Sequence, residues 1–165
     1  MPESDAMDEL ARNLVRELIE SGRSVAAAES CTGGWIAKSI TDVPGASLCF
    51  SYGIVSYSNG AKESLLGVSP RTLEQFGAVS EATVREMAEG VIKLSGADLA
   101  VAVSGIAGPD GGSAEKPVGT VWFAWAERQK RKTRLRVKRH NFDGDRLAVR
   151  QKAVVTALQG LRELL

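Results

Sequence analysis

The sequence has 165 residues, of which 44% are hydrophobic and 25% are charged, and its formal net charge is +1. These values predict a single globular domain, and they exclude collagen-like and intrinsically disordered chains. No apolar run approaches the roughly 18 residues of a membrane span, and the polar, acidic start MPESDAMDEL is not a signal peptide. We therefore expect a cytoplasmic protein without membrane contact, while the bulk charge gives no argument for or against nucleic acid.

The first half of the chain predicts helices and strands that alternate. Apolar residues on one helical face predict a helix over 7–20. The apolar run 24–28 predicts a buried strand, and a short helix over 35–41 is expected after two glycines. An alternating segment, 51–57, predicts a second strand that leads into an Asn-Gly turn.

The second half predicts more helices, a central strand and a hairpin. The remaining predicted elements are helices over 70–76, 81–94 and 146–164 and strands over 98–103, 118–127 and 133–142. Serines at N-cap positions begin two of these helices, and a long glycine-rich loop, 104–117, follows the most apolar strand. Strands that first alternate with helices and then form a hairpin predict an α/β fold, a three-layer α/β/α sandwich with a mixed sheet.

Cysteine and histidine are scarce, which limits the chemistry that the chain can perform. Cys31 and Cys49 are too few for a disulfide framework, and we expect both to be free thiols. A single histidine, His140, excludes a metal site built from several histidines. It also leaves a nucleophile without its usual base unless His140 itself serves, so a lysine is the natural candidate for that role.

Two loops, 29–34 and 104–117, each follow a predicted buried strand. Because ligands in open α/β sheets bind where strands end and helices begin, we expect these loops to line one crevice. Their glycines let a ligand approach the main chain, and amides at a helix start favour an anion such as phosphate. Neither loop matches a Walker or G-x-G-x-x-G pattern, so plain glycine turns are an equal alternative.

Serine and lysine supply one set of candidate catalytic residues. Ser47 follows the turn over 44–46, where it either caps a helix or faces the crevice. Lys62 is either a solvated surface charge or a buried base that deprotonates a serine. Tyr57 is either a core residue or a hydroxyl donor. The sequence alone does not place Ser47 beside Lys62.

Cys31 is the rival nucleophile, because a thiolate is favoured near the start of a helix, although a small buried cysteine is the commoner outcome. Glu29 is interpreted as an acceptor for backbone amides around the turn that follows it. Arg146, at the start of the last predicted helix, either caps that helix locally or clamps a phosphate.

Residues 128–139 contain eight lysines and arginines. Such a basic segment could bind nucleic acid. However, it spans a predicted hairpin turn and a strand without interleaved aromatic residues, so a solvated sheet edge is the favoured interpretation.

Five stretches of the chain together resemble the CinA C-terminal domain family, and within it the stand-alone nicotinamide mononucleotide deamidases. The stretches are AESCTGGWIAKSITDVPGAS, GIVSYSNGAKESLLGV, GAVSEATV, SGIAGPDGGSAEKPVGTVWFA and GDRLAVR. They extend from about residue 25 to the last helix, so the resemblance covers nearly the whole domain and is more specific than any single loop. The length leaves no room for the separate N-terminal domain of long CinA proteins, which implies one domain over 1–165.

The resemblance implies an amidohydrolase that converts nicotinamide mononucleotide (NMN) and water to nicotinate mononucleotide and ammonia, in pyridine nucleotide salvage. It implies a serine–lysine mechanism without a metal or other cofactor, with Ser47 as the nucleophile, Lys62 as the base, and Ser30 and Tyr57 in support. The residues implied in binding the ribose phosphate and the carboxamide are Thr32, Gly33, Gly34, Ser104, Gly105, Gly108 and Arg146. The motifs do not decide between Ser30 and Ser47 as the attacking serine.

Three other interpretations stay open. One is a non-catalytic nucleotide-binding or regulatory module, because the CinA name is tied to competence and DNA damage. Another is a nucleic-acid binder that uses residues 128–139, and the third is a cysteine amidase that uses Cys31. Tryptophans and apolar strand faces in a small α/β domain also predict a homodimer.

Overall fold

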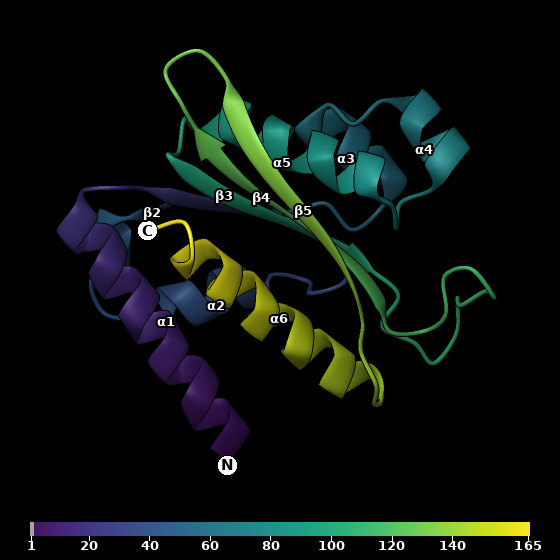
Figure 1. Ribbon diagram of the computed structural model, residues 1–165, viewed down its shortest axis with the longest axis horizontal. Coiled ribbons are helices and arrows are strands. Elements are labelled where there is room, and N and C mark those ends of the chain that lie inside the picture. Colours follow the sequence, from purple (N-terminus) through teal and green to yellow (C-terminus); the bar gives the residue numbers. More distant parts are fainter. Residues whose placement is uncertain (1) are drawn as a thin grey trace.

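The computed structural model describes the main chain of residues 2–165 and the side chains of residues 5–165. Its elements are α1 (Pro2–Ser21), β1 (Val25–Glu29), α2 (Trp35–Thr41), the 3-10 helix η1 (Ala46–Leu48), β2 (Phe50–Val55), α3 (Asn59–Leu66), α4 (Pro70–Phe76), α5 (Glu81–Ser95), β3 (Leu99–Gly105), β4 (Thr120–Arg128), β5 (Thr133–Asn141) and α6 (Arg146–Arg162). Figure 1 shows the sheet between two helical layers, with α1, α2 and α6 on one face and α3, α4 and α5 on the other. The predicted three-layer sandwich is confirmed.

The five strands form one mixed sheet in the order β2-β1-β3-β4-β5. β1 is parallel to both β2 and β3, whereas β4 is antiparallel to β3 and β5. Every residue of β1 is buried, as are the first six residues of β3, because helices cover both faces of the sheet there. The carboxyl ends of β1 and β3 therefore lie side by side at one edge of the sheet.

One α-helix, α3, and the short 3-10 helix η1 are not among the elements predicted from the sequence. Asn59 and Gly60 were interpreted as a turn, but they begin α3, and the side chain of Ser58 caps this helix by accepting a hydrogen bond from the amide of Ala61 at 3.1 Å. An Asn-Gly pair commonly forms a hairpin turn, whereas a serine directly before it supplies the cap that a helix start needs. This helix carries Lys62 toward the carboxyl ends of the strands.

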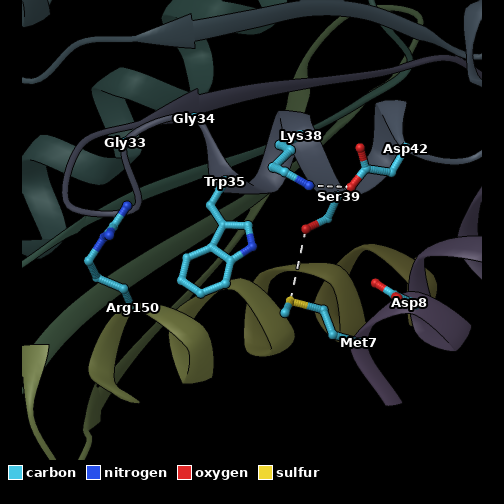
Figure 2. Close-up of a pocket in the computed structure, with 9 residues that line it drawn as sticks. All are labelled: Met7, Asp8, Gly33, Gly34, Trp35, Lys38, Ser39, Asp42 and Arg150. Carbon is cyan, nitrogen blue, oxygen red and sulfur yellow. Dashed lines mark hydrogen bonds and ion pairs between the residues drawn. The ribbon is translucent and has the colours of Figure 1, made fainter. Parts of the chain in front are cut away.

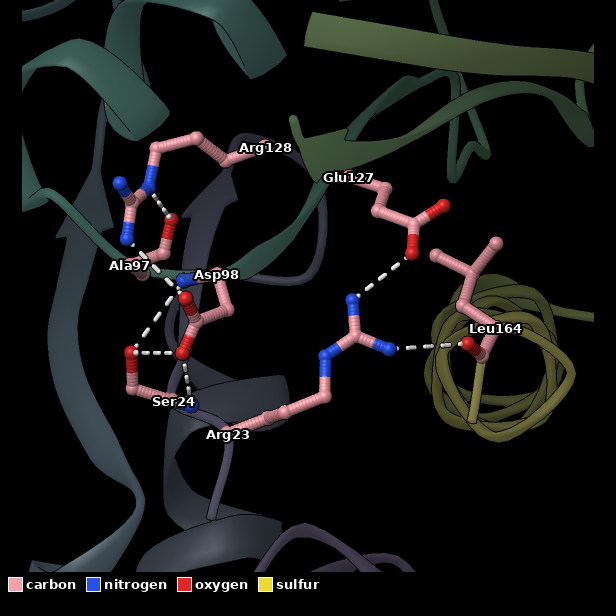
Figure 3. Close-up of polar contacts among 7 residues, drawn as sticks. All are labelled: Arg23, Ser24, Ala97, Asp98, Glu127, Arg128 and Leu164. Carbon is pink, nitrogen blue, oxygen red and sulfur yellow. Dashed lines mark hydrogen bonds and ion pairs between the residues drawn. The ribbon is translucent and has the colours of Figure 1, made fainter. Parts of the chain in front are cut away.

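The opposite edge of the sheet is held by a polar network (Figure 3). Asp98 accepts hydrogen bonds from the amide of Ser24 at 2.9 Å and from its hydroxyl at 3.2 Å, and it also pairs with Arg128 at 3.0 Å. Nearby, Arg23 pairs with Glu127 at 2.9 Å. These contacts tie the amino ends of β1 and β3 to the end of β4. Within residues 2–165, no helix is long and apolar enough to cross a membrane.

Two apolar cores lie on the two faces of the sheet, and Gly160 sets the closest approach of α6. A Cβ atom built on Gly160 would lie 2.1 Å from Cε2 of Trp125 on β4. The indole Nε1–H of Trp125 donates to the carbonyl of Ala157 at 3.0 Å, which fixes the ring in this position. The ring therefore has little freedom to move away from an added methyl group.

We expect Gly160→Ala to lower the free energy of unfolding by about 1–3 kcal/mol, because it overpacks this contact. Urea denaturation followed by circular dichroism measures the change. Gly60→Ala is the matched control, since a Cβ there meets only Ser58 Oγ at 3.9 Å, and helix propensity should raise stability by up to about 1 kcal/mol. Equal stability of Gly160→Ala and the parent protein would contradict this packing.

Candidate active site

Ser30 and Lys62 meet at the carboxyl end of β1. Ser30 is the first residue after this strand, and its amide donates to the carbonyl of Val103 on β3 at 3.0 Å. Lys62 lies on α3 and is only 1% exposed. Its Nζ is 3.0 Å from Oγ of Ser30. A lysine this deeply buried is rare unless its nitrogen is satisfied by specific partners.

Two main-chain carbonyls complete the surroundings of the Lys62 nitrogen. Nζ donates to the carbonyl of Ser56 at 2.9 Å and to the carbonyl of Tyr57 at 3.1 Å. A charged Lys62 would donate its three N–H groups to these two carbonyls and to Ser30 Oγ, whereas a neutral amine would keep its two N–H groups on the carbonyls and turn its lone pair to the hydroxyl of Ser30. Burial lowers the pKa of Lys62 from its usual 10.5, because desolvation disfavours the charged form. Desolvation therefore favours the neutral amine of Lys62, the form that could accept a proton from a hydroxyl 3.0 Å away.

Glu29 holds the turn that follows Ser30. Its buried carboxylate accepts hydrogen bonds from the hydroxyl of Thr32 at 2.7 Å, from the amide of Ile36 at 2.8 Å and from the amide of Ala37 at 3.0 Å. These two amides lie in the first turn of α2, where main-chain N–H groups have no carbonyl partner within the helix. The interpretation of Glu29 as an acceptor for backbone amides is confirmed. Glu29 is thus occupied and is not free to act as a base.

Ser30 and Lys62 open onto a cavity of about 270 Å³. The residues that line it are Ser30, Cys31, Tyr57, Lys62, Ala78, Val79, Ser104, Gly105, Ile106, Ala107, Gly108, Asp110, Gly111 and Arg146. The loop after β1 and the loop after β3 therefore share one crevice, as predicted. The structure brings together seven of the predicted site residues, which are Ser30, Tyr57, Lys62, Ser104, Gly105, Gly108 and Arg146.

Arg146 reaches across the mouth of this cavity from the start of α6. Its guanidinium donates to the carbonyl of Gly108 at 2.8 Å and to the hydroxyl oxygen of Tyr57 at 3.2 Å. Asp145, rather than Arg146, caps the helix, because its side chain accepts from the amide of Ala148 at 2.9 Å. Arg146 is exposed, so its remaining N–H groups can meet an anion at the cavity mouth.

Ser47 lies at the amino ends of the strands, opposite the end of the sheet that carries Ser30 and Lys62. It is exposed in η1, before β2 begins, and the register pairs Val25 with Phe50 at one end and Glu29 with Val55 at the other. At about 3.3 Å per residue, the length of β2 places the amino and carboxyl ends of these strands about 16 Å apart. The expected contact between Ser47 and Lys62 is therefore wrong, and Ser30 takes that place.

Three other predicted binding residues do not line the cavity. The hydroxyl of Thr32 is buried and donates to Glu29. Gly33 and Gly34 line a separate groove between α1, α2 and α6, where Figure 2 places them beside Trp35. Their φ angles of 61° and 95° lie in the left-handed region, so their contribution is the tight turn between Ser30 and α2. The turn that directly follows Ser30 therefore fixes the position of its main chain.

Cys31 also lines the cavity, but its thiol is not activated. Burial raises the pKa of Cys31 to about 12, because desolvation disfavours the thiolate. A thiol that stays protonated at neutral pH is a poor nucleophile. The structure therefore supports the interpretation of Cys31 as a small buried cysteine rather than a nucleophile.

Sequence reasoning missed several lining residues and the carbonyl groups that hold Lys62. Ala78 and Val79 come from the segment before α5, and Asp110 and Gly111 come from the loop after β3. The glycine-rich composition signalled that loop, whereas residues 78 and 79 stood out only as part of the GAVSEATV stretch of the family resemblance, with no site role attached to them. The basic segment 128–139 lies largely on the edge strand β5, where Arg136 pairs with Glu163 at 2.6 Å and stacks over Trp125.

Comparison with known proteins shows the family to which the chain belongs. The model of the CinA C-terminal domain family matches residues 7–165. A protein of Enterobacter agglomerans named nicotinamide-nucleotide amidohydrolase PncC is 56% identical over 160 residues, which cover 96% of each chain. Its namesake in Escherichia coli strain K12 is 52% identical over 161 residues, which cover 98% of this chain and 95% of that protein. The crystal structure of competence damage-inducible protein A from Klebsiella pneumoniae gives a TM-score of 0.90 at 43% identity, with 95% of each chain covered. This chain therefore belongs to the CinA C-terminal domain family.

Proposed function

We propose that this protein is a nicotinamide-nucleotide amidohydrolase that converts NMN and water to nicotinate mononucleotide and ammonia. The single observation that carries the proposal is the distance of 3.0 Å between Lys62 Nζ and Ser30 Oγ at the base of a cavity. The printed names of relatives that are 52–56% identical support the substrate. The serine–lysine mechanism, with Ser30 in place of Ser47, rests on the contacts of the site.

The reaction follows from the protons that these two residues can exchange. Ser30 Oγ attacks the carboxamide carbon of NMN while its proton moves to the neutral amine of Lys62. The tetrahedral intermediate collapses when Lys62 returns this proton to the leaving nitrogen, which departs as ammonia. Water then attacks the acyl-serine, Lys62 accepts a proton from it, and the collapse of the second intermediate releases the carboxylate and restores Ser30. One amide and one water give one acid and one ammonia.

Other parts of the cavity match the charges of the substrate and of the intermediate. Arg146 at the mouth can form charge-assisted hydrogen bonds to the phosphate of the nucleotide. The main-chain amides that directly follow Ser30 are the nearest candidates to stabilise the negative oxygen of the tetrahedral intermediate, as in other acyl transfers. Arg146 would therefore govern substrate binding, and the amides would govern the rate of the chemical step.

Ammonia release from NMN by the purified protein tests this proposal. The assay includes EDTA, and chromatography of the nucleotide product checks that nicotinate mononucleotide forms in equal amount. Turnover that continues in EDTA, and that Cys31→Ala retains within about threefold, is expected. A folded protein that binds NMN but releases no ammonia would instead indicate the non-catalytic module, and loss of activity in a folded Cys31→Ala variant would indicate a cysteine amidase.

The pH dependence of turnover tests the role of Lys62 as the base. Because burial lowers the pKa of Lys62, the amine becomes neutral as pH rises through this lowered value, and kcat/KM should rise with it. The midpoint of the rise should lie below pH 10.5, the usual pKa of a lysine, because kcat/KM reports the pKa of the free enzyme. Initial rates in buffers from mildly acidic to alkaline pH give the profile. A flat profile across this range would contradict the lysine base.

A further inference from the structure

A second arginine of α6 holds the turn that carries Ser30. Arg150 lies four residues after Arg146, so both side chains leave the same face of the helix. Its Nε donates to the carbonyl of Cys31 at 3.1 Å, and its terminal nitrogen donates to the carbonyl of Thr32 at 3.0 Å. Figure 2 shows the guanidinium between Gly33 and the ring of Trp35, and its carbon lies 5.4 Å from the centre of that ring.

Arg150 does not line the cavity that Ser30 opens onto. It lines the groove on the α1, α2 and α6 face of the sheet, on the far side of the turn from Lys62. Arg150 is therefore not among the residues placed to contact a substrate held in that cavity. Any effect of Arg150 on the reaction has to pass through the main chain of the turn.

The Cys31 carbonyl that Arg150 holds determines where the amide of Thr32 points, whereas the next amide, of Gly33, donates to the carbonyl of Ser30 at 3.0 Å. In a planar trans peptide, the N–H points away from the C=O, so fixing the Cys31 carbonyl toward Arg150 directs the amide of Thr32 to the opposite side. Helix α6 lies on one face of the sheet, whereas α3 with Lys62 lies on the other (Figure 1). The amide of Thr32 is thereby directed toward the side of the reacting groups. A guanidinium on the carbonyl also polarises the peptide, which strengthens its N–H as a donor.

We infer that Arg150 is a positioning residue for catalysis. It orients and polarises the Cys31–Thr32 peptide so that the amide of Thr32 stabilises the tetrahedral intermediate, and it keeps Ser30 Oγ at Lys62 Nζ. The inference rests on the proposed function in one respect, because it takes Ser30 as the nucleophile. It adds that the two arginines of the GDRLAVR motif divide their roles, with Arg146 facing the substrate and Arg150 facing the nucleophile's turn.

Steady-state kinetics of Arg150→Gln and Arg150→Lys with NMN test the inference. We expect Arg150→Gln to lower kcat by about 10-fold to 100-fold, since small misplacements of reacting groups have effects of this size, while KM changes less than about twofold. Arg150→Lys keeps the charge but cannot bind both carbonyls in a fork, so it should recover only part of kcat. Arg162→Gln is the matched control, because Arg162 is on the same helix and pairs with Glu17 away from the cavity. A KM effect at constant kcat would overturn the inference.

Two further measurements complete the test. The first distinguishes a positioning role of Arg150 from a general loss of structure, and the second does not depend on NMN being the substrate. Arg150→Ala opens space in a groove that is accessible to solvent, so added guanidinium at non-denaturing concentration should raise its kcat and leave that of Arg162→Ala unchanged. A fluorophosphonate labels an activated serine when Oγ attacks phosphorus and fluoride leaves. The rate of labelling of Ser30 should fall at least about 10-fold in Arg150→Gln, even if NMN is not the substrate. Labelling at the parental rate would overturn the role of Arg150.

Discussion

Ser30→Ala is expected to lower the rate of ammonia release from NMN by at least about 10⁴-fold, because removal of a serine nucleophile has effects of this order. Oγ of Ser30 is the hydroxyl in contact with Lys62 Nζ, whereas burial raises the pKa of the Cys31 thiol to about 12 and the hydroxyl of Thr32 donates to Glu29. A coupled assay for ammonia measures the loss, and circular dichroism checks that the variant is folded.

Ser47→Ala is the matched control for this prediction. Ser47 is exposed at the amino ends of the strands, so its replacement should leave kcat and KM within about twofold of the parent protein, as for an ordinary surface substitution. The reverse pattern, with Ser47→Ala inactive and Ser30→Ala active, would overturn the assignment of the nucleophile.

Lys62→Met is expected to lower kcat by about 10³-fold or more, because it removes the proton acceptor while keeping an unbranched side chain of similar length. Lys62→Arg should be equally inactive. It keeps a positive charge next to Ser30, but a guanidinium stays protonated and cannot accept a proton. The two variants together distinguish a base from a residue that acts only through its charge.

Lys38→Met serves as the control for the lysine series. Lys38 lies on α2, pairs with Asp42 on the protein surface and is absent from the catalytic cavity, so its loss should not change kcat. Substantial activity in Lys62→Arg would show that the charge of Lys62, and not its basicity, supports the reaction. That result would contradict the proposed mechanism.

Most of the fold could be predicted from the sequence because its signals were local. The apolar run of β1, the nearly continuous apolar run of β3 and the serine caps of α4 and α5 each carry their own physical reason. The element α3 was missed because the Asn-Gly pair at its start has two competing meanings, and the cap from Ser58 together with packing against α5 selects the helix. Without α3, the burial of Lys62 could not be foreseen.

Predicting the serine–lysine pair requires knowing whether each residue lies at the amino or the carboxyl ends of the strands. Ser30 follows a strand, whereas Ser47 precedes one. In a sheet whose first strands are parallel, these positions lie at opposite edges, and ligands gather at the carboxyl ends. The sequence therefore contained a signal in favour of Ser30. The contacts of Lys62 with the carbonyls of Ser56 and Tyr57 could not be predicted, because they depend on the path of the main chain between β2 and α3.

The central claim is that Ser30 forms the covalent bond to the substrate. Mass spectrometry of peptides from protein quenched in acid during turnover of NMN tests it most directly. Cleavage after arginine and lysine separates Ser30, on peptide 24–38, from Ser47, on peptide 39–62, and fragmentation separates Ser30 from Cys31. The account predicts the mass of nicotinate mononucleotide less water on Ser30. The same added mass on Ser47 or Cys31 would contradict it.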